Sequence, residues 1–97
     1  MTKIEPYLIR KLDPQQRMVF AQLTFKQDIL TTSEMRDLLR LSDRSIREKV
    51  SHWREEGFIE QHDQDTKRVR SVKLSIEYEK LAQDIRNAPD KFAHFLK

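Results

Sequence analysis

Residues 42–57, SDRSIREKVSHWREEG, decide the fold that we expect. Three apolar residues stand four and then three positions apart, which is the spacing of one edge of an α-helix: Ile46, Val50 and Trp53. Ser42 can cap the start of this helix, and Gly57, the only glycine in the chain, can end it in the left-handed conformation. The stretch therefore predicts a helix over residues 43–56 with one buried edge and a polar opposite face.

Two capped helices are predicted ahead of this one. Thr31, followed three residues later by Glu34, is a capping box in front of the apolar residues Met35, Leu38 and Leu39. Only a few residues separate that helix from the helix over 43–56, which is typical of a helix-turn-helix. An earlier helix is expected from Asp13-Pro14 onward. The apolar residues expected to face inward on it are Met18, Val19, Phe20 and Leu23.

A β-hairpin is predicted directly after the glycine. Residues 58–62 and 69–74 have strand character, and the polar residues 63–68 between them form the tip. A further helix should start at Ser75 as its cap, with an inward face that we list as Ile76, Leu81 and Ile85. A last short apolar helix is expected over residues 90–96.

The fold class that follows is α+β, mainly α: a winged helix-turn-helix with a three-helix core, a β-hairpin wing and an additional C-terminal helix. We expect a single winged-helix domain over residues 1–97, with its core at 12–75. Residues 1–11 form an N-terminal arm, in which Tyr7, Leu8 and Ile9 either pack as a short helix or lie extended against a partner. Residues 76–97 are the C-terminal helices and a candidate dimer contact.

The composition of the chain excludes several classes of function. The chain has 97 residues, of which 37% are hydrophobic and 36% charged, and it has no cysteine. It shows no secretory leader pattern and no apolar run long enough to cross a bilayer, so we expect a cytoplasmic protein without a membrane partner. The three histidines lack metal-ligand spacing and one glycine cannot form a phosphate loop, so neither a metal site, nor a cofactor, nor an enzyme is expected.

Basic residues cluster in the two segments that a winged helix presents to DNA. The formal charge of the chain is +3, and residues 66–73 hold four basic residues and no acid. In a helix-turn-helix, the second helix enters the major groove. The outward positions of the helix over 43–56 carry side chains that can bind bases: Arg44, Ser45, Arg47, Glu48, Ser51 and His52.

Phosphate and minor-groove contacts are expected on either side of that helix. Thr32 and Ser33 begin the preceding helix, where backbone N–H groups favour a phosphate. In the wing, which we place at residues 63–70 against the minor groove, the candidate contacts are Lys67, Arg68 and Arg70. The predicted function is therefore a sequence-specific regulator of transcription that binds double-stranded DNA.

The motifs resemble those of the MarR family of winged-helix transcriptional regulators. The family pattern LTxSELA is similar to residues 30–36, LTTSEMR, and its LxxxGL exit from the recognition helix is similar to residues 53–59, WREEGFI. The family wing resembles residues 63–75, and the likeness as a whole covers about residues 12–82. It implies a minor-groove role for Arg68, which falls on the family's wing-tip arginine.

The resemblance also sets expectations about partners. The family dimerises through long terminal helices, so we expect a homodimer whose candidate contacts are Tyr7, Leu8, Ile9, Phe92, Phe95 and Leu96. Because little chain remains for those helices, a small-molecule effector in the pocket beside them is not expected. Thr66 and Tyr78 depart from the family's usual aspartate and glycine. The alternative function is a winged-helix module for protein–protein contact in a larger assembly.

Overall fold

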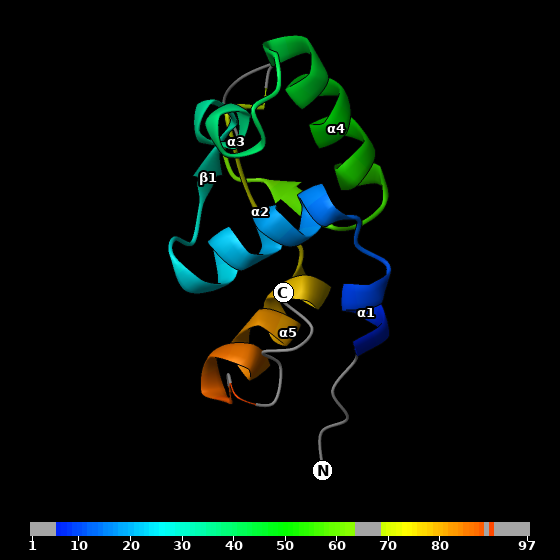
Figure 1. Cartoon of the computed structure of the whole chain (residues 1–97), viewed down its shortest axis with the longest axis vertical. Helices are drawn as coiled ribbons and strands as arrows, with labels where there is room; N and C mark the ends of the chain where they lie inside the picture. Colours follow the sequence, from blue (N-terminus) through cyan, green and yellow to red (C-terminus); the bar gives the residue numbers. More distant parts are fainter. Residues whose placement is uncertain (1–5, 64–68, 89, 91–97) are drawn as a thin grey trace.

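The computed structural model describes residues 6–63, 69–88 and 90. The elements follow in the order α1 (Pro6–Arg10), α2 (Pro14–Phe25), β1 (Leu30–Thr31), α3 (Thr32–Leu39), α4 (Asp43–Glu55), β2 (Ile59–Gln61), β3 (Ser71–Leu74) and α5 (Ile76–Asn87). In Figure 1, α3 and α4 lie at one end of the molecule and α5 lies at the other, with α2 between them. The predicted winged helix-turn-helix is confirmed.

The predicted helix starts are confirmed by their hydrogen bonds. The Asp13 carboxylate accepts from the Gln16 N–H at 2.8 Å, and the Gln16 side chain accepts from the Asp13 N–H at 3.0 Å. Thr31 and Glu34 form the same reciprocal pair at the start of α3, with both bonds at 3.0 Å. The Ser42 hydroxyl accepts from the third N–H of α4 at 3.2 Å. Local sequence alone therefore fixes where α2, α3 and α4 begin.

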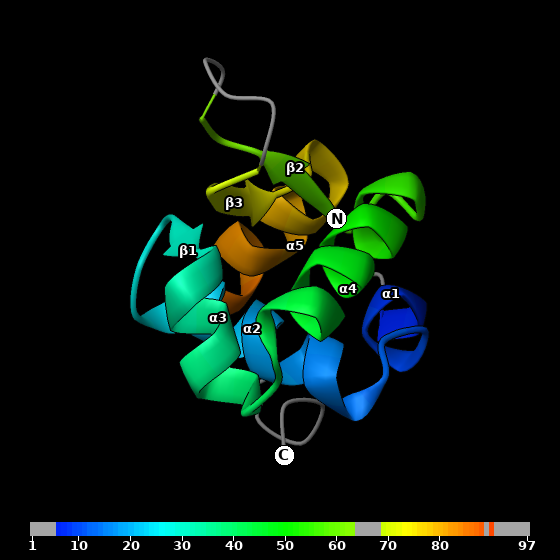
Figure 2. The ribbon, with the colours of Figure 1, turned by 90° about the horizontal axis from the view of Figure 1, so that it is seen from above.

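Three short strands form an antiparallel sheet in the order β1-β3-β2. The register pairs Leu30 with Val72 and Ile59 with Leu74, so the buried side chains of the three strands face the helices together. Figure 2 shows the sheet along the flank of α3 and α4, which lie against each other. The sheet therefore fixes the root of the hairpin beside the helix-turn-helix.

A row of four aromatic rings joins the elements of the core. Phe20 of α2 meets Tyr78 of α5 with centroids 6.1 Å apart, and Tyr78 meets Phe58 at 5.1 Å. Phe58 in turn meets Trp53 of α4 at 5.7 Å, and all three contacts are edge-to-face. Such pairs add roughly 0.5–1.5 kcal/mol each beyond the area that they bury. The row thus links α2, α5 and the rear edge of α4.

Two residues expected in the inward stripes are exposed instead. Met18 is 45% exposed and Ile76 is 69% exposed. The buried stripe of α2 is Gln16, Val19, Phe20 and Leu23, and that of α5 is Tyr78, Leu81, Ala82 and Ile85. At 3.6 residues per turn, position 18 is turned about 100° from position 19, and position 76 about 200° from position 78. The helical rotation therefore carries both side chains away from the core.

The cap of α5 also differs from the prediction. Ser75 occupies the N-cap position, but its side chain makes no capping hydrogen bond because it is turned into the core and buried. The Glu60 carboxylate of β2 accepts from the Ile76 N–H at 3.2 Å. A residue distant in sequence therefore supplies the cap that Ser75 was expected to provide.

Residues 6–10 form a helix, which decides between the two alternatives for the N-terminal arm. Leu8 and Ile9 are 2% and 0% exposed, so the expectation that they form dimer contacts is wrong: the core of the chain already covers them. Tyr7 is 53% exposed. The Tyr78 hydroxyl donates to the Leu8 carbonyl at 3.2 Å and so ties α1 to α5. The expected helix over 90–96 lies outside the described residues, apart from Asp90.

Two residues end helices in the left-handed conformation. Gly57 has φ +79°, as predicted for the residue after α4. Arg40, at the end of α3, has φ +56° and ψ +48°, a conformation that costs a residue with a Cβ roughly 1–2 kcal/mol. The turn between α3 and α4 therefore contains a strained arginine where glycine is common, which the sequence pattern did not reveal.

The pH dependence of the free energy of unfolding tests whether burial raises the pKa of the Tyr78 phenol. Burial, followed by the nearby charges of Glu77 and Glu56, raises the pKa of Tyr78 from 10.0 to about 12. Because the native state holds this proton more tightly than the unfolded state, the stability that Tyr78 contributes is complete below pH 10. It is lost as the pH rises through 12.

Urea denaturation between pH 10 and 12 measures this loss. The free energy of unfolding should fall more steeply in the unaltered chain than in Tyr78→Phe, which has no phenol to ionise. Tyr7→Phe, which alters the exposed tyrosine, should keep most of the steep fall. Equal slopes for the unaltered chain and Tyr78→Phe would contradict the assignment.

Candidate nucleic-acid interface

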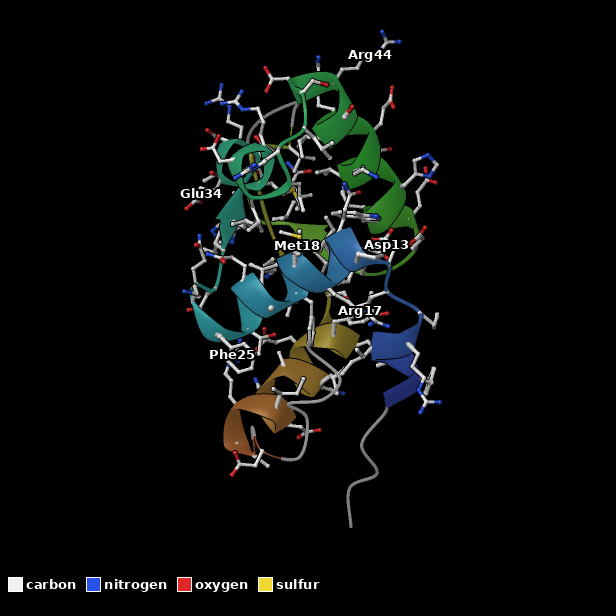
Figure 3. The ribbon with its side chains drawn as sticks, in the orientation of Figure 1. Asp13, Arg17, Met18, Phe25, Glu34 and Arg44 are labelled. Carbon is white, nitrogen blue, oxygen red and sulfur yellow. The ribbon has the colours of Figure 1, made fainter. Side chains whose placement is uncertain are left out.

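Helix α4 has a buried edge and an exposed face. Ile46, Val50 and Trp53 are 2%, 3% and 3% exposed, so the predicted rear edge is confirmed. The opposite face carries five of the predicted contact residues, all exposed: Arg44, Arg47, Glu48, Ser51 and His52. Figure 3 shows Arg44 extending away from the ribbon at the free end of α4. The side chains that were predicted to bind bases are therefore directed away from the core.

A cleft of about 470 Å³ opens between α4, the start of α3 and the approach to β3. Its apolar floor consists of Ile46, Val50 and Val69. Its polar walls consist of Thr32, Asp43, Arg47, Ser51, Arg54 and Arg70. The cleft therefore brings together predicted residues from the three segments that a winged helix presents to DNA.

Arg54 lies in this cleft although it was not among the predicted site residues. It is exposed, follows Arg47 by seven positions and follows Ser51 by three. On a helix these spacings place all three residues on one face. The periodicity of the helix is therefore the signal that could have identified Arg54.

Four predicted residues of α4 lie outside the cleft, and three of them are on its outer strip. Arg44, Glu48 and His52 are spaced four apart along an outer strip of the helix. The Arg44 guanidinium lies 3.5 Å from the Glu48 carboxylate, and their side chains are 87% and 66% exposed. Such an exposed pair contributes roughly 0.3–0.5 kcal/mol, so it can open at little cost when another partner arrives.

Two of the four predicted hydroxyl residues, Ser45 and Ser33, already have partners within the chain. Ser45 is half-buried, and its hydroxyl lies 3.2 Å from that of Ser42 at the helix cap. The Ser33 hydroxyl accepts from the Arg36 guanidinium at 3.3 Å. Ser45 therefore belongs to the cap of α4 more than to its outward face.

The backbone N–H groups at the start of α3 are those expected to face a phosphate. The Thr32 N–H donates to the Arg70 carbonyl at 2.9 Å, because pairing between β1 and β3 continues into the helix. The Glu34 N–H donates to Thr31. The Thr32 amide is therefore already paired within the chain, and Thr32 lines the cleft with its half-exposed side chain; the phosphate contact at the start of α3 stays a prediction.

The Asp63 carboxylate fixes the root of the hairpin. One of its oxygens accepts from the Arg70 N–H at 3.0 Å, from the Ser71 N–H at 2.8 Å and from the Ser71 hydroxyl at 3.2 Å. These bonds hold the backbone of Arg70 beside the cleft. Two further predicted contacts, Lys67 and Arg68, lie outside the described residues.

The cleft is predominantly basic. Its walls carry the guanidinium groups of Arg47, Arg54 and Arg70, and the single acid in the described part of its lining is Asp43. Asp43 in turn pairs with Arg36 of α3, with 2.6 Å between nitrogen and oxygen. A surface with this balance attracts an anion, and the field is strongest where the arginines converge.

The described part of the chain has neither a metal-binding cluster nor a membrane-spanning helix. Residues 6–63, 69–88 and 90 contain no cluster of three or more His, Cys, Asp or Glu side chains that could hold a metal ion. Within the same ranges, every helix is too short or too polar to cross a membrane.

Comparison with solved structures identifies proteins that have the same fold as this chain. The chain superposes on transcriptional regulator Tm0710 from Thermotoga maritima with a TM-score of 0.64 and 13% identity, over 91% of this chain and 63% of that one. It superposes on NMB1585, a MarR family regulator from Neisseria meningitidis, with a TM-score of 0.62 and 14% identity, over 93% and 63%. A MepR like protein complexed with pseudoligands gives a TM-score of 0.63 and 17% identity, over 93% and 67%.

The fold is therefore that of the MarR-type winged helix, as the sequence motifs predicted. The chain spans about two thirds of the length of these structures. No family model and no curated protein matches the sequence. At this level of identity the likeness establishes the fold, while the function rests on the chain's own surface.

Removing the Asp63 carboxylate should loosen the root of the hairpin. In Asp63→Ala, the N–H groups of Arg70 and Ser71 lose a charged acceptor, which is worth roughly 1.5–3 kcal/mol per bond. Hydrogen exchange should therefore accelerate at these two amides. Asp37→Ala, at an exposed position on α3, is the control and should leave both rates unchanged. Unchanged exchange in Asp63→Ala would show that the sheet alone holds the hairpin root.

Proposed function

We propose that this protein is a regulator of transcription that binds double-stranded DNA, with α4 in the major groove. The observation that carries the proposal is the basic cleft between α4, α3 and β3, flanked by an exposed polar face on α4. The MarR-type fold supports it, because the structures with the same fold include two that are described as regulators. The convex face of a helix, with long polar side chains, fits the width of the major groove.

Sequence recognition is assigned to the outward side chains of α4. Arg44 and Arg47 can each donate two hydrogen bonds to a guanine, and Glu48 can accept from a cytosine. The Arg44–Glu48 pair would open on binding, so that each charge meets a base or a phosphate. Ser51 and His52 lie one turn further along the helix and would contact the bases or phosphates at the edge of the site.

Phosphate binding is assigned to the two walls of the cleft. Arg54 and Arg70 extend the basic surface to either side of Arg47, and Thr32 adds a hydroxyl from the start of α3. These contacts position the protein without selecting a sequence. The wing residues Lys67 and Arg68 complete the proposal at the adjacent minor groove, with Arg68 assigned by its place in the motif.

The proposed functional unit is a homodimer. A two-fold dimer would bind two half-sites about one helical turn apart. Because Leu8 and Ile9 are buried within the chain, the remaining candidates for the interface are Tyr7, which is exposed, and the C-terminal residues Phe92, Phe95 and Leu96. Sedimentation of the protein alone and with a duplex would give its stoichiometry. We propose no small-molecule effector.

A salt titration of duplex binding tests the function. Binding that neutralises several phosphates should weaken steeply as salt increases, with a linear relation between the logarithms of affinity and salt concentration. Arg70→Ala should reduce that slope by about one and weaken binding to all duplexes similarly.

Arg47→Ala should also relax base preference, at a cost of about 1–3 kcal/mol for the preferred duplex.

Lys80→Ala is the matched control, because it removes one positive charge at an exposed position on α5, at the opposite end of the molecule (Figure 1). It should leave affinity and slope close to those of the unaltered chain. Duplex binding that is absent, or that does not depend on salt, would contradict the proposal and favour the protein–protein interaction module. Equal, sequence-independent losses in Arg47→Ala and Arg70→Ala would count against base recognition by α4.

A further inference from the structure

An ion pair connects the last turn of α3 to the first turn of α4 in the helix-turn-helix. One guanidinium nitrogen of Arg36 lies 2.6 Å from the Asp43 carboxylate, and the other lies 3.3 Å from the Ser33 hydroxyl. Ser33 and Arg36 are in α3, while Asp43 is the first residue of α4. The contact therefore spans the turn that sets the position of α4 relative to α3.

Stability does not account for this contact. The side chains of Arg36 and Asp43 are 41% and 72% exposed, and exposed ion pairs contribute roughly 0–1 kcal/mol. Among the described residues that line the cleft, Asp43 is also the only acid, and the other charged residues are three arginines. An acid at that position weakens attraction to every phosphate, so it reduces non-specific affinity unless it gains a hydrogen bond of its own.

We propose that Asp43, positioned by Arg36, is a specificity-determining residue that accepts a hydrogen bond from the exocyclic amino group of a cytosine in the major groove. The inference rests on the proposed function. Asp43 lies at the N-terminal end of α4, which is the end that a helix-turn-helix presents to base edges. A carboxylate is suited to the cytosine amino group, which is the only hydrogen-bond donor of that base in the major groove.

Discrimination between duplex sequences follows from the negative charge of Asp43. Where the duplex offers a cytosine, the carboxylate gains a donor. Where it offers the carbonyl oxygen of guanine or thymine, the carboxylate oxygen that Arg36 leaves free faces another acceptor and nearby phosphates, and it gains no donor. Unpaired charge against the wrong partner is one of the two ways in which specificity arises. Asp43 therefore lowers affinity for non-cognate duplexes more than it raises affinity for the cognate one.

Arg36 is a positioning residue in this scheme. Its guanidinium fixes one carboxylate oxygen of Asp43 and leaves the other oxygen for the base. Only one nitrogen contacts Asp43, so a lysine ammonium could reproduce the contact in part, whereas an uncharged chain could not. This difference separates a positioning role from simple packing of the side chain.

Selection from a pool of random duplexes, followed by sequencing of the bound fraction, tests the proposal. The unaltered chain should select sites with one fixed C·G pair. In Asp43→Asn, preference at that pair should fall by about tenfold, while affinity for unselected duplexes rises. Asp37→Asn makes the same charge change at an exposed position outside the cleft, and it should select the original motif. Arg36→Met should weaken the preference, and Arg36→Lys should restore part of it.

The outcomes are distinguishable. Identical motifs for the unaltered chain and Asp43→Asn would overturn the role of Asp43 and leave the proposed function standing. An equal loss of preference in Asp37→Asn would also overturn it, because the effect would then follow net charge alone. Failure of the unaltered chain to enrich any duplex would overturn the proposed function, and the role of Asp43 with it.

Discussion

The geometry of the proposed interface depends on how the buried edge of α4 packs against the rest of the core. Trp53 packs edge-to-face on Phe58, which continues through Tyr78 to Phe20, so the rear edge of α4 is coupled to α5 and α2 by a row of rings. With Ile46 and Val50 buried along the same edge, the rotation of α4 about its axis is fixed. Every outward side chain of the helix takes its direction from that constraint.

The sheet positions the parts of the proposed interface that lie outside α4. Pairing of β1 with β3 brings the start of α3 against the backbone of Arg70, and the Asp63 carboxylate secures the root of the hairpin. The arginines of the cleft therefore come from two separate parts of the chain, α4 and the segment before β3. Their mutual repulsion is tolerated because the three side chains are exposed and solvent screens their charges.

Much of this could be predicted from local sequence, because the signals that start and stop helices are local. The capping pairs of Asp13 and Thr31, the cap at Ser42 and the end at Gly57 all lie where the pattern placed them. The errors at Met18 and Ile76 arose where an apolar residue stands next to the buried stripe, since composition does not fix rotation. The cap by Glu60 and the covering of Leu8 and Ile9 depend on contacts between distant segments, which no local pattern encodes.

The central claim is that the outward face of α4 and the root of the hairpin contact double-stranded DNA. Titrating the ¹⁵N-labelled chain with a short duplex and following its amide resonances tests this claim most directly. We expect shifts that are concentrated in the first turn of α3, along α4 and at Arg70, with α5 unaffected. Shifts confined to α5 and the exposed side of α2, or no shifts at all, would contradict it.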